Sequence, residues 1–452
     1  MLHARMSRRG AAGAGIGLAG GALAACQPPA AGTPPGEPPP VARPVTIELA
    51  TDWTTPTRKP VIELMRDGFV AANPNATVNL QLAPDSGSSG ETYSQRIIAQ
   101  VAAGTPPDVI ANWWFYQHSG ALADLTRDAP LAGYKKAEVV YHPQFQEVEG
   151  KLLMLSMNST VGGWIYNRSL FDEAGLKDPD DAWTLDDVLG AAQKLTKREK
   201  GQWGLELKFG PEFGWLDPLW AGGAGSTGQA SAVMFEDRPP RSRLAEAGGP
   251  AAFEWYLDCV HKHRVAPTAE ETAAQGVAFA KGNVGLRPFG LYNSGATAKL
   301  IGDNFVWSAM PTPRHPGTKR RAYSVVQEGF FVAQAARARG SFDTALRFVM
   351  AFYGDPVMRS VAELRSTLPI VRRWIESKEH LAAPPLNLEV IPKILNDPSF
   401  IVGTMQNWSP RRTAWDQATN AELQAAYRGE AAPRARSAGA RPPGWPGSRS
   451  RS

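Results

Sequence analysis

Aromatic and acidic residues stand together where the sequence pattern predicts that strands end. Asp52 and Trp53 follow one predicted strand, and Trp113 and Trp114 follow another. Aromatic rings stack on apolar C–H faces and carboxylates accept hydrogen bonds from hydroxyls, so this pairing suits a sugar. The alternative for each ring is core packing. Four aromatic residues in a row cannot all point inward, so we expect at least one in residues 113–116 to face a ligand.

Carboxylates can also hydrolyse glycosides. That chemistry needs two of them at a fixed separation, and Asp52 with Glu328 or Glu212 is one possible combination. The chain has 43 Asp and Glu residues, so such combinations arise by chance. Nothing in the spacing singles out an acid and a base. A secreted lipoprotein glycoside hydrolase or polysaccharide lyase is therefore kept as the alternative function, and no catalytic residue is assigned.

Other chemistries lack support in the sequence. His261 and His263 stand two positions apart and face apart on a helix, so no metal site is expected there. The chain has neither a phosphate-binding G-x-x-x-x-G-K-[ST] segment nor a dinucleotide fingerprint. Cys259 lies in a helical apolar stripe, which predicts a buried, inert thiol. We expect no cofactor.

The first 26 residues have the pattern of an export signal. Three arginines precede an apolar run over residues 11–25 that ends in small side chains. This run is too short to cross about 30 Å of hydrocarbon. Its ending, Leu23-Ala24-Ala25-Cys26, resembles a bacterial lipobox. We therefore expect residues 1–25 to be a lipoprotein signal peptide and Cys26 to carry the lipid.

Details of this signal stay open. Ser7-Arg8-Arg9 resembles the twin-arginine export motif, but any basic signal start fits as well, so both export routes remain possible. Either Met1 or Met6 begins the chain. Gln27 is not the Asp that would indicate retention at an inner membrane, and the type of cell envelope is not given by the sequence.

The basic residues are concentrated at the two ends. The chain has a net charge of +5 and a pI of about 9.1. The signal carries +3 and residues 431–452 carry five arginines without an acid, which leaves about −3 for residues 26–430. This mildly acidic body argues against nucleic-acid binding. Residues 26–44 are rich in proline and predict an extended tether, and residues 431–452 predict a disordered Arg/Pro/Ser tail.

Between these ends, strand and helix patterns alternate. Such alternation predicts parallel sheets covered by helices, which bind ligands at the carboxyl ends of their strands. The predicted elements include strands at residues 45–49, 78–80 and 108–110, helices at 59–72 and 93–103, and a capping box from Thr184 to Asp187 before another helix.

Ordered segments carry a resemblance to a known family. They include A-A-G-T-P-P-D-V at residues 102–109, G-K-L at 150–152, G-W-I-Y-N-R-S-L-F at 163–171, A-W-T-L-D-D at 182–187, and residues 256–267, 279–292 and 305–311. Over residues 45–428 the set resembles the extracellular solute-binding proteins (family 1) of bacterial ABC transporters, the sugar-binding family that includes maltose-binding protein.

The resemblance implies an α/β fold of the type II periplasmic-binding-protein kind. Two lobes, each a mixed sheet flanked by helices, are joined by a multi-segment hinge and close on a solute. We expect crossings near residues 157–159, 309–311 and 366–369. The N-terminal lobe is then residues 45–158 plus 310–368, and the C-terminal lobe is residues 159–309 plus 369–430.

The resemblance also implies ligand-binding residues. Trp215 begins a W-x-x-x-x-x-x-G-G segment like the family's cleft segment, and Tyr292 stands at a usual tryptophan position. Pro410 departs from the helix expected there. Glu328 either contacts solute or caps the following segment. The full predicted ligand-binding set is Asp52, Trp53, Trp113, Trp114, Glu212, Trp215, Tyr292, Glu328, Trp408 and Arg412.

The function implied by the resemblance is solute capture and delivery. We expect a monomeric, lipid-anchored protein at the periplasmic or extracellular face of the cell membrane. It binds a mono- or oligosaccharide without catalysis and passes it to the permease subunits of an ABC importer. A family member for a non-sugar solute is a further alternative, and an anionic solute would need converging arginines. The sequence identifies neither the sugar nor the cognate permease.

Overall fold

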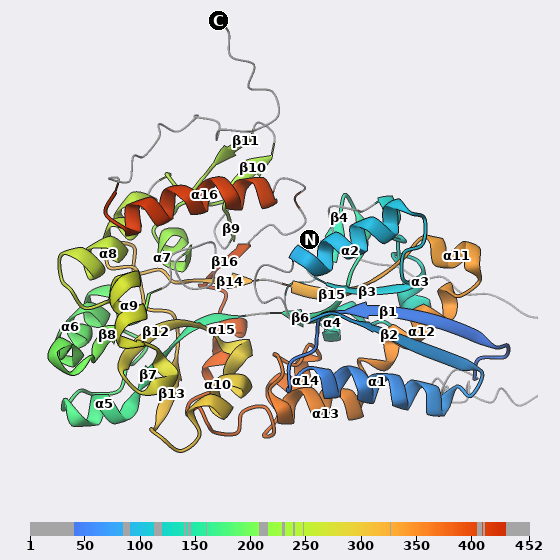
Figure 1. The fold of residues 1–452 in the computed structure, drawn as a ribbon, viewed down its shortest axis with the longest axis horizontal. Coiled ribbons are helices and arrows are strands. Elements are labelled where there is room, and N and C mark those ends of the chain that lie inside the picture. Colours follow the sequence, from blue (N-terminus) through green and yellow to red (C-terminus); the bar gives the residue numbers. More distant parts are fainter. Residues whose placement is uncertain are drawn as a thin grey trace, which may run out of the picture. The chain divides into compact units, whose positions relative to one another are not determined.

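The computed structural model describes residues 40–84, 91–112, 120–139, 142, 146–159, 161–207, 216–227, 231–237, 240–246, 248–325, 327–404, 409 and 412–430. Within them, mixed α/β structure forms two lobes around separate sheets (Figure 1). The α/β prediction is confirmed. Cys26 and the predicted tail at 431–452 lie outside the described residues.

The first lobe is built on a five-stranded sheet with the order β2-β1-β3-β15-β6. β1 runs parallel to β2 and β3, whereas β15 runs antiparallel to β3 and β6. A parallel sheet with one returning strand follows from the alternation of strands and helices along residues 45–112. The strands are β1 (Val45–Thr51), β2 (Ala76–Leu82), β3 (Val109–Asn112), β6 (Leu155–Ser159) and β15 (Gln327–Val332).

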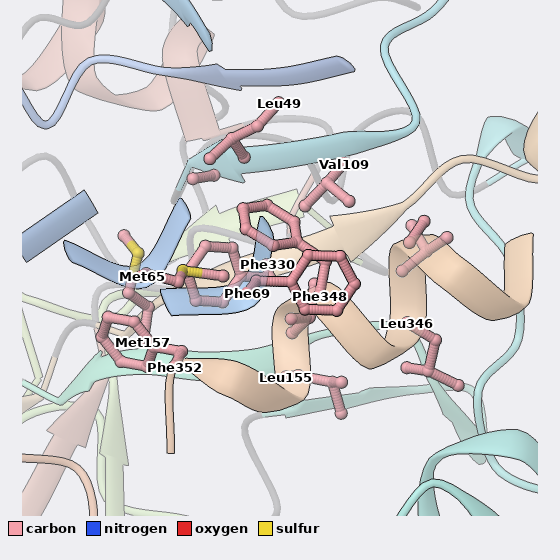
Figure 2. Packing of buried hydrophobic residues seen from close by; sticks show 14 of the residues in the cluster. Leu49, Met65, Phe69, Val109, Leu155, Met157, Phe330, Leu346, Phe348 and Phe352 are labelled. Atoms are coloured by element: carbon pink, nitrogen blue, oxygen red, sulfur yellow. The ribbon is translucent and has the colours of Figure 1, made fainter. Parts of the chain in front are cut away.

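Helices cover both faces of this sheet, as Figure 1 shows with α1 and α12 below it and α2 above it. Because side chains alternate along a strand, Leu49 faces the helix pair while Ala50 faces α2. Figure 2 shows the larger of the two cores, in which Phe69 of α1 meets Phe348 of α12 with ring centroids 5.3 Å apart. The helices are α1 (Lys59–Ala72), α2 (Glu91–Ala102), α3 (Asp128–Leu131), α4 (Lys136–Val139), α11 (Ala335–Arg339), α12 (Phe342–Ala351), α13 (Asp355–Leu364) and α14 (Arg372–Ile375), with a hairpin of β4 (Glu147–Val148) and β5 (Lys151–Leu152).

Asp108, the acid of the P-P-D-V segment, has a structural role. It is buried directly before β3 and accepts hydrogen bonds from the Glu48 amide at 3.0 Å, from Arg339 Nη2 at 2.6 Å and from Ser341 Oγ at 2.6 Å. The carboxylate therefore fastens the start of β3 to the corner between α11 and α12.

The second lobe contains a four-stranded sheet of order β13-β7-β12-β8 and a three-stranded parallel sheet of order β14-β16-β9. Both faces of β7 are covered, which is why all its residues are buried. Trp164 faces one core and Ile165 faces the other. The strands are β7 (Gly162–Asn167), β8 (Trp203–Leu205), β9 (Ser231–Val233), β12 (Val284–Gly290), β13 (Trp307–Met310), β14 (Ala322–Val325) and β16 (Ile401–Thr404), with a hairpin of β10 (Phe235–Asp237) and β11 (Pro240–Ser242).

Local signals explain where several second-lobe helices begin. The predicted capping box is present: Thr184 Oγ1 accepts from the Asp187 amide, and the Asp187 carboxylate accepts from the Thr184 amide. The predicted burial of Cys259 in a helix is also confirmed. The helices are α5 (Arg168–Glu173), α6 (Leu185–Leu195), η4 (Arg198–Lys200), α7 (Leu216–Ala221), α8 (Gly249–His261), α9 (Ala269–Gln275), η5 (Phe279–Lys281), η6 (Leu291–Asn293), α10 (Ser294–Ile301), α15 (Val390–Asn396) and α16 (Arg412–Tyr427).

Strand membership locates the segments that cross between the lobes. The chain leaves the first-lobe sheet after β6 and enters the second-lobe sheet at β7. It returns between β14, which pairs with β16, and β15, which pairs with β3 and β6. The expected first-lobe segment beginning at residue 310 is corrected here, because β14 belongs to a second-lobe sheet. The return lies at residues 325–327.

A third connection runs through residues 365–375. Val371 and Trp374 pack in the first-lobe core, whereas Leu368 and Ile375 pack in the second-lobe core beside α15. This segment therefore contributes side chains to both lobes.

No helix within the described ranges is long and apolar enough to span a membrane.

Candidate functional site at the crossing segments

The carboxyl end of β1 brings two side chains to the crossings. Trp53 follows the strand after Asp52, and its amide donates to Thr51 Oγ1 at 3.1 Å. A turn held by Thr54 Oγ1, which donates to the Ala83 carbonyl at 2.9 Å, leads to α1. Arg58 occupies the position directly before that helix. Strand β1 and helix α1 thus fix where both side chains point.

Glu328, at the start of β15, is the centre of the site. Its Oε2 accepts from Trp53 Nε1 at 2.9 Å and from Asn158 Nδ2 at 3.3 Å. Its Oε1 lies 3.8 Å from Arg58 Nη1. The Arg58 guanidinium also lies over the Trp53 ring, 5.0 Å from its centroid. Groups from β1, β6 and β15 therefore meet at one carboxylate.

The same guanidinium reaches the third connection, since Arg58 Nε donates to the Ser366 carbonyl at 3.3 Å. We call Trp53, Arg58, Asn158, Glu328 and Ser366 the hinge cluster. Its contacts join two first-lobe strands, at the end of β6 and the start of β15, to the segment after α13.

The hinge cluster has unused hydrogen-bonding capacity. Asn158 Oδ1, Ser366 Oγ and the neighbouring Thr367 Oγ1 are buried and have no hydrogen-bond partner among the described residues. Burying such an atom without a partner costs about 1–3 kcal/mol. The cost falls when a hydroxyl or a water reaches these atoms. The cluster is therefore suited to polar, hydroxyl-bearing partners.

The charges in the cluster offset each other. The side chains of Arg58 and Glu328 are each 15% exposed, so their ion pair is partly shielded from solvent. One carboxylate beside one guanidinium presents little net charge to a ligand. This balance favours a neutral solute over an anion, which would need several cations.

Trp53 does not offer the stacking surface that we predicted. Its side chain is 1% exposed. Its ring meets Phe352 edge to face at a centroid distance of 6.2 Å and is covered on one face by Arg58. In this structure the indole N–H instead orients Glu328. Asp52 is partly exposed beside it.

Arg412 also differs from its predicted role. Its side chain is 1% exposed, and Nε donates to Asp416 Oδ2 at 2.6 Å. Burial in the second-lobe core lowers the pKa of Arg412 and raises that of Asp416. Arg412 therefore stabilises the start of α16 and does not face solvent.

Tyr292 lies in η6 at the end of β12 and is partly buried. Its ring covers Gly290, where a side chain would overlap it. The remaining predicted residues fall outside the described residues, and they are Trp113, Trp114, Glu212, Trp215 and Trp408.

The sequence analysis missed Arg58, Asn158 and Ser366. Asn158 and Ser366 lie inside two of the segments where crossings were expected, and a polar side chain in such a crossing segment was the available signal. Arg58 had no clear signal, because its polar partners Glu328 and Ser366 are distant in sequence. Among the described residues no group of three or more His, Cys, Asp or Glu side chains is arranged to hold a metal.

Comparison with known families agrees with this architecture. The family model described as bacterial extracellular solute-binding protein matches residues 51–354. The chain belongs to this family. Membership places it among exported binding proteins and confirms the resemblance seen in the sequence.

Individual relatives are distant. A candidate binding protein of Brucella abortus is 26% identical over 161 residues, which are 33% of this chain and 35% of the relative. The chain therefore spans about a third of the length of the curated relatives that it matches. Another such protein, from Brucella suis, has the same identity and coverage.

Solved structures share the fold over most of the chain. An ABC substrate-binding protein of Listeria monocytogenes in complex with cycloalternan has a TM-score of 0.69 at 19% identity, covering 86% of this chain and 95% of that one. Maltose-bound MalE3 of T. maritima has a TM-score of 0.67 at 17% identity, covering 86% and 96%. UgpB of Mycobacterium tuberculosis in complex with glycerophosphocholine has a TM-score of 0.66 at 17% identity, covering 86% and 94%. These likenesses confirm the two-lobed type II fold.

Proposed function

We propose that this chain is a lipid-anchored binding protein that captures a carbohydrate and delivers it to the permease of an ABC importer. The observation that carries the proposal is the hinge cluster, where a charge-balanced carboxylate and unpartnered polar atoms meet at three crossing segments. Family membership supports solute capture, and the sugars bound by the Listeria and T. maritima proteins support carbohydrate as the solute.

In this proposal the lobes close because the solute contacts both of them and so favours the closed state. Glu328 and Asn158 hydrogen-bond sugar hydroxyls at the crossings, and Trp53 and Arg58 hold Glu328 in place. Asp52 and Tyr292, together with Trp113, Trp114, Glu212, Trp215 and Trp408, supply the further polar and stacking contacts that the sequence predicts.

We propose binding without catalysis. Glycoside hydrolysis needs a second carboxyl group across the bond that is cleaved. Glu328 is instead held by two N–H donors and lies near a guanidinium, as a positioned acceptor would be. The family of binding proteins supports the same conclusion.

The lipid anchor at Cys26 and the proline-rich tether are part of the proposal. At the described end of the tether, the Val41 amide donates to Asn73 Oδ1 at 3.1 Å, and Asn75 Nδ2 donates to the Val41 carbonyl at 3.0 Å. These bonds fasten the chain to the first lobe before β1 begins. Trp53 lies at the other end of that strand, so the tether joins the lobe away from the hinge cluster.

Thermal-shift measurement of the purified chain against maltose, maltotriose, cyclic glucans and glycerophosphocholine tests the proposal. A bound sugar is expected to raise the melting temperature through linkage. Glu328→Gln is expected to reduce that shift, and the exposed Glu363→Gln serves as the matched control. A shift with glycerophosphocholine alone would replace the sugar by a non-sugar solute. No shift with any sugar, together with release of reducing ends from a polysaccharide, would favour the enzyme alternative.

A further inference from the structure

Asp217, in α7, is a fully buried carboxyl group that the proposed function does not use. Its Oδ1 accepts from Ser324 Oγ at 2.6 Å, and the Ser324 backbone also hydrogen-bonds the carboxyl group. Its Oδ2 has no hydrogen-bond partner among the described residues. Within the described residues, only one of the two carboxyl oxygens therefore has a hydrogen-bond partner, in an otherwise apolar core.

Asp217 packs against both strands that adjoin the crossings on the second-lobe side. Ser324 belongs to β14, from which the chain returns to the first lobe. Gly162 begins β7, directly after the first crossing. A Cβ at Gly162 would lie 3.1 Å from Asp217 Oδ2 and 3.4 Å from the Ser324 amide nitrogen. The carboxyl group therefore packs closely against both strands, and a side chain at Gly162 would crowd it.

No basic group faces Asp217 from the described elements around it. Burial raises its pKa to about 7, and the hydrogen bonds from Ser324 only partly oppose that shift. From α8, Tyr256 lies near, and its own pKa is raised by burial and then by the Asp217 charge. Glu254, Asp258 and His261 of the same helix are at least partly exposed.

The remaining elements add no nearby cation. β16 carries only Thr404 as a polar side chain, and β14 contributes Ser324. His315, whose pKa is lowered by burial, packs at the other end of α7, where a Cβ at Gly222 would lie 3.2 Å from its Nε2.

We propose that Asp217 is a proton-linked lock: its neutral carboxyl group holds α7 against β7 and β14, and its ionisation loosens this contact. An ionised carboxylate needs more donors than the hydroxyl and the amide of one serine, and no cation among the described residues offsets its desolvation. Loosening α7 lets water or a further donor reach Oδ2.

This lock affects solute affinity if the proposed function holds. α7 begins at residue 216, directly after residues 208–215, which include the predicted ligand residues Glu212 and Trp215. Displacing the first turn of α7 displaces their attachment point. Affinity is therefore expected to fall as pH rises through 7.

The sign of the stability change follows from linkage. The neutral form is favoured in the folded chain, so the stabilisation from this group is complete below its ordinary pKa of 3.8 and is lost as pH rises toward 7. Between pH 5.5 and 8.5, the melting temperature of the wild type should fall roughly 2–3 °C more than that of Asp217→Asn. A difference titration should show one extra proton released by the wild type, with a midpoint near pH 7.

Controls separate this lock from other titrations. Asp258→Asn removes an acid on the outer face of α8 and should leave the midpoint unchanged. His315→Gln removes the histidine at the far end of α7 and should also leave the midpoint of the titration unchanged. Ser324→Ala removes a donor to the carboxylate and should move the midpoint upward, which keeps the proposal testable if Asp217→Asn does not fold.

A midpoint near pH 4, or equal pH slopes in the wild type and in Asp217→Asn, would overturn the lock. These two readouts need no solute, so they stay decisive if no sugar binds and the proposed function fails. When a sugar does bind, its dissociation constant should rise severalfold from pH 5.5 to 8.5 in the wild type and stay level in Asp217→Asn. An equal rise in both would overturn the link to affinity.

Discussion

Two carboxyl groups lie where the chain crosses between the lobes, and their hydrogen-bond donors and burial differ. Glu328, on the first-lobe side, receives N–H bonds from Trp53 and Asn158 and lies near a guanidinium. Asp217, on the second-lobe side, is fully buried, and among the described residues its donors are the hydroxyl and the amide of Ser324. The first environment supplies donors for a charge, whereas the second disfavours one.

The difference separates two tasks. A carboxylate that is already held by donors changes little when a solute arrives, so Glu328 suits recognition. A carboxyl group whose ionisation is disfavoured by burial responds to pH, so Asp217 suits regulation. The following variants test whether this contrast holds.

Trp53→Ala should have the largest effect. It removes a fully buried ring and one of the two N–H donors to Glu328, and it should lower the free energy of unfolding by about 3–5 kcal/mol. Trp53→Phe keeps most of the packing and should cost about 1–2 kcal/mol for the lost donor. Urea unfolding at pH 7 measures both. No loss of stability in Trp53→Phe would mean that packing alone matters and that the bond to Glu328 contributes nothing.

Asp217→Asn should stabilise the chain at alkaline pH, because the amide cannot ionise. The shift from 3.8 to about 7 sets an upper limit of about 4 kcal/mol on the gain at pH 8.5. At pH 5 the upper limit on the gain is smaller, about 1.6 kcal/mol, because only the part of the stabilisation between pH 3.8 and pH 5 has been lost there. Urea unfolding at the two pH values checks this. Destabilisation at pH 8.5 would remove the contrast with Glu328.

Glu328→Gln should destabilise the chain, whereas Asp217→Asn should stabilise it. The amide keeps the shape of the side chain but leaves Arg58 without its ion-pair partner, so a loss of about 1–2 kcal/mol is expected at pH 7. The Glu363→Gln control should stay within about 0.5 kcal/mol of the wild type. Stabilisation by Glu328→Gln would show that the first-lobe carboxylate is also poorly paired.

Ser366→Ala should have the smallest effect on stability. Its Oγ is buried without a partner among the described residues, so removing it should change the free energy of unfolding by no more than about 0.5 kcal/mol, or raise it slightly. If the hinge cluster binds sugar hydroxyls, the same variant should still weaken sugar binding in calorimetric titration. A large loss of stability would reveal a structural partner for this hydroxyl.

Features fixed by near neighbours were predictable from the sequence. The bounds of α1 followed from apolar residues at helical spacing up to Asn73, and the capping box at Thr184 needed only residues three positions apart. The two-lobed fold followed from the resemblance. These features depend on patterns within a few turns of chain.

Features fixed by distant partners were not predictable. The orientation of Trp53 depends on Glu328, which is 275 positions away, and on Phe352. The placement of β14 depends on β16, nearly eighty residues later, because an apolar strand pairs with whichever sheet edge the fold presents. For Arg412 the partner Asp416 is near in sequence, but the burial of the pair depends on the distant elements that pack around it.

The bonds that hold Val41 to Asn73 and Asn75 determine where mechanical load enters the molecule. Tension along the preceding segment passes into β1, which lies between β2 and β3 and is bonded to both along parallel ladders. Such ladders resist sliding because many bonds must shear together. A pull applied to this end of the chain would therefore be borne by the first-lobe sheet before it reached the second lobe.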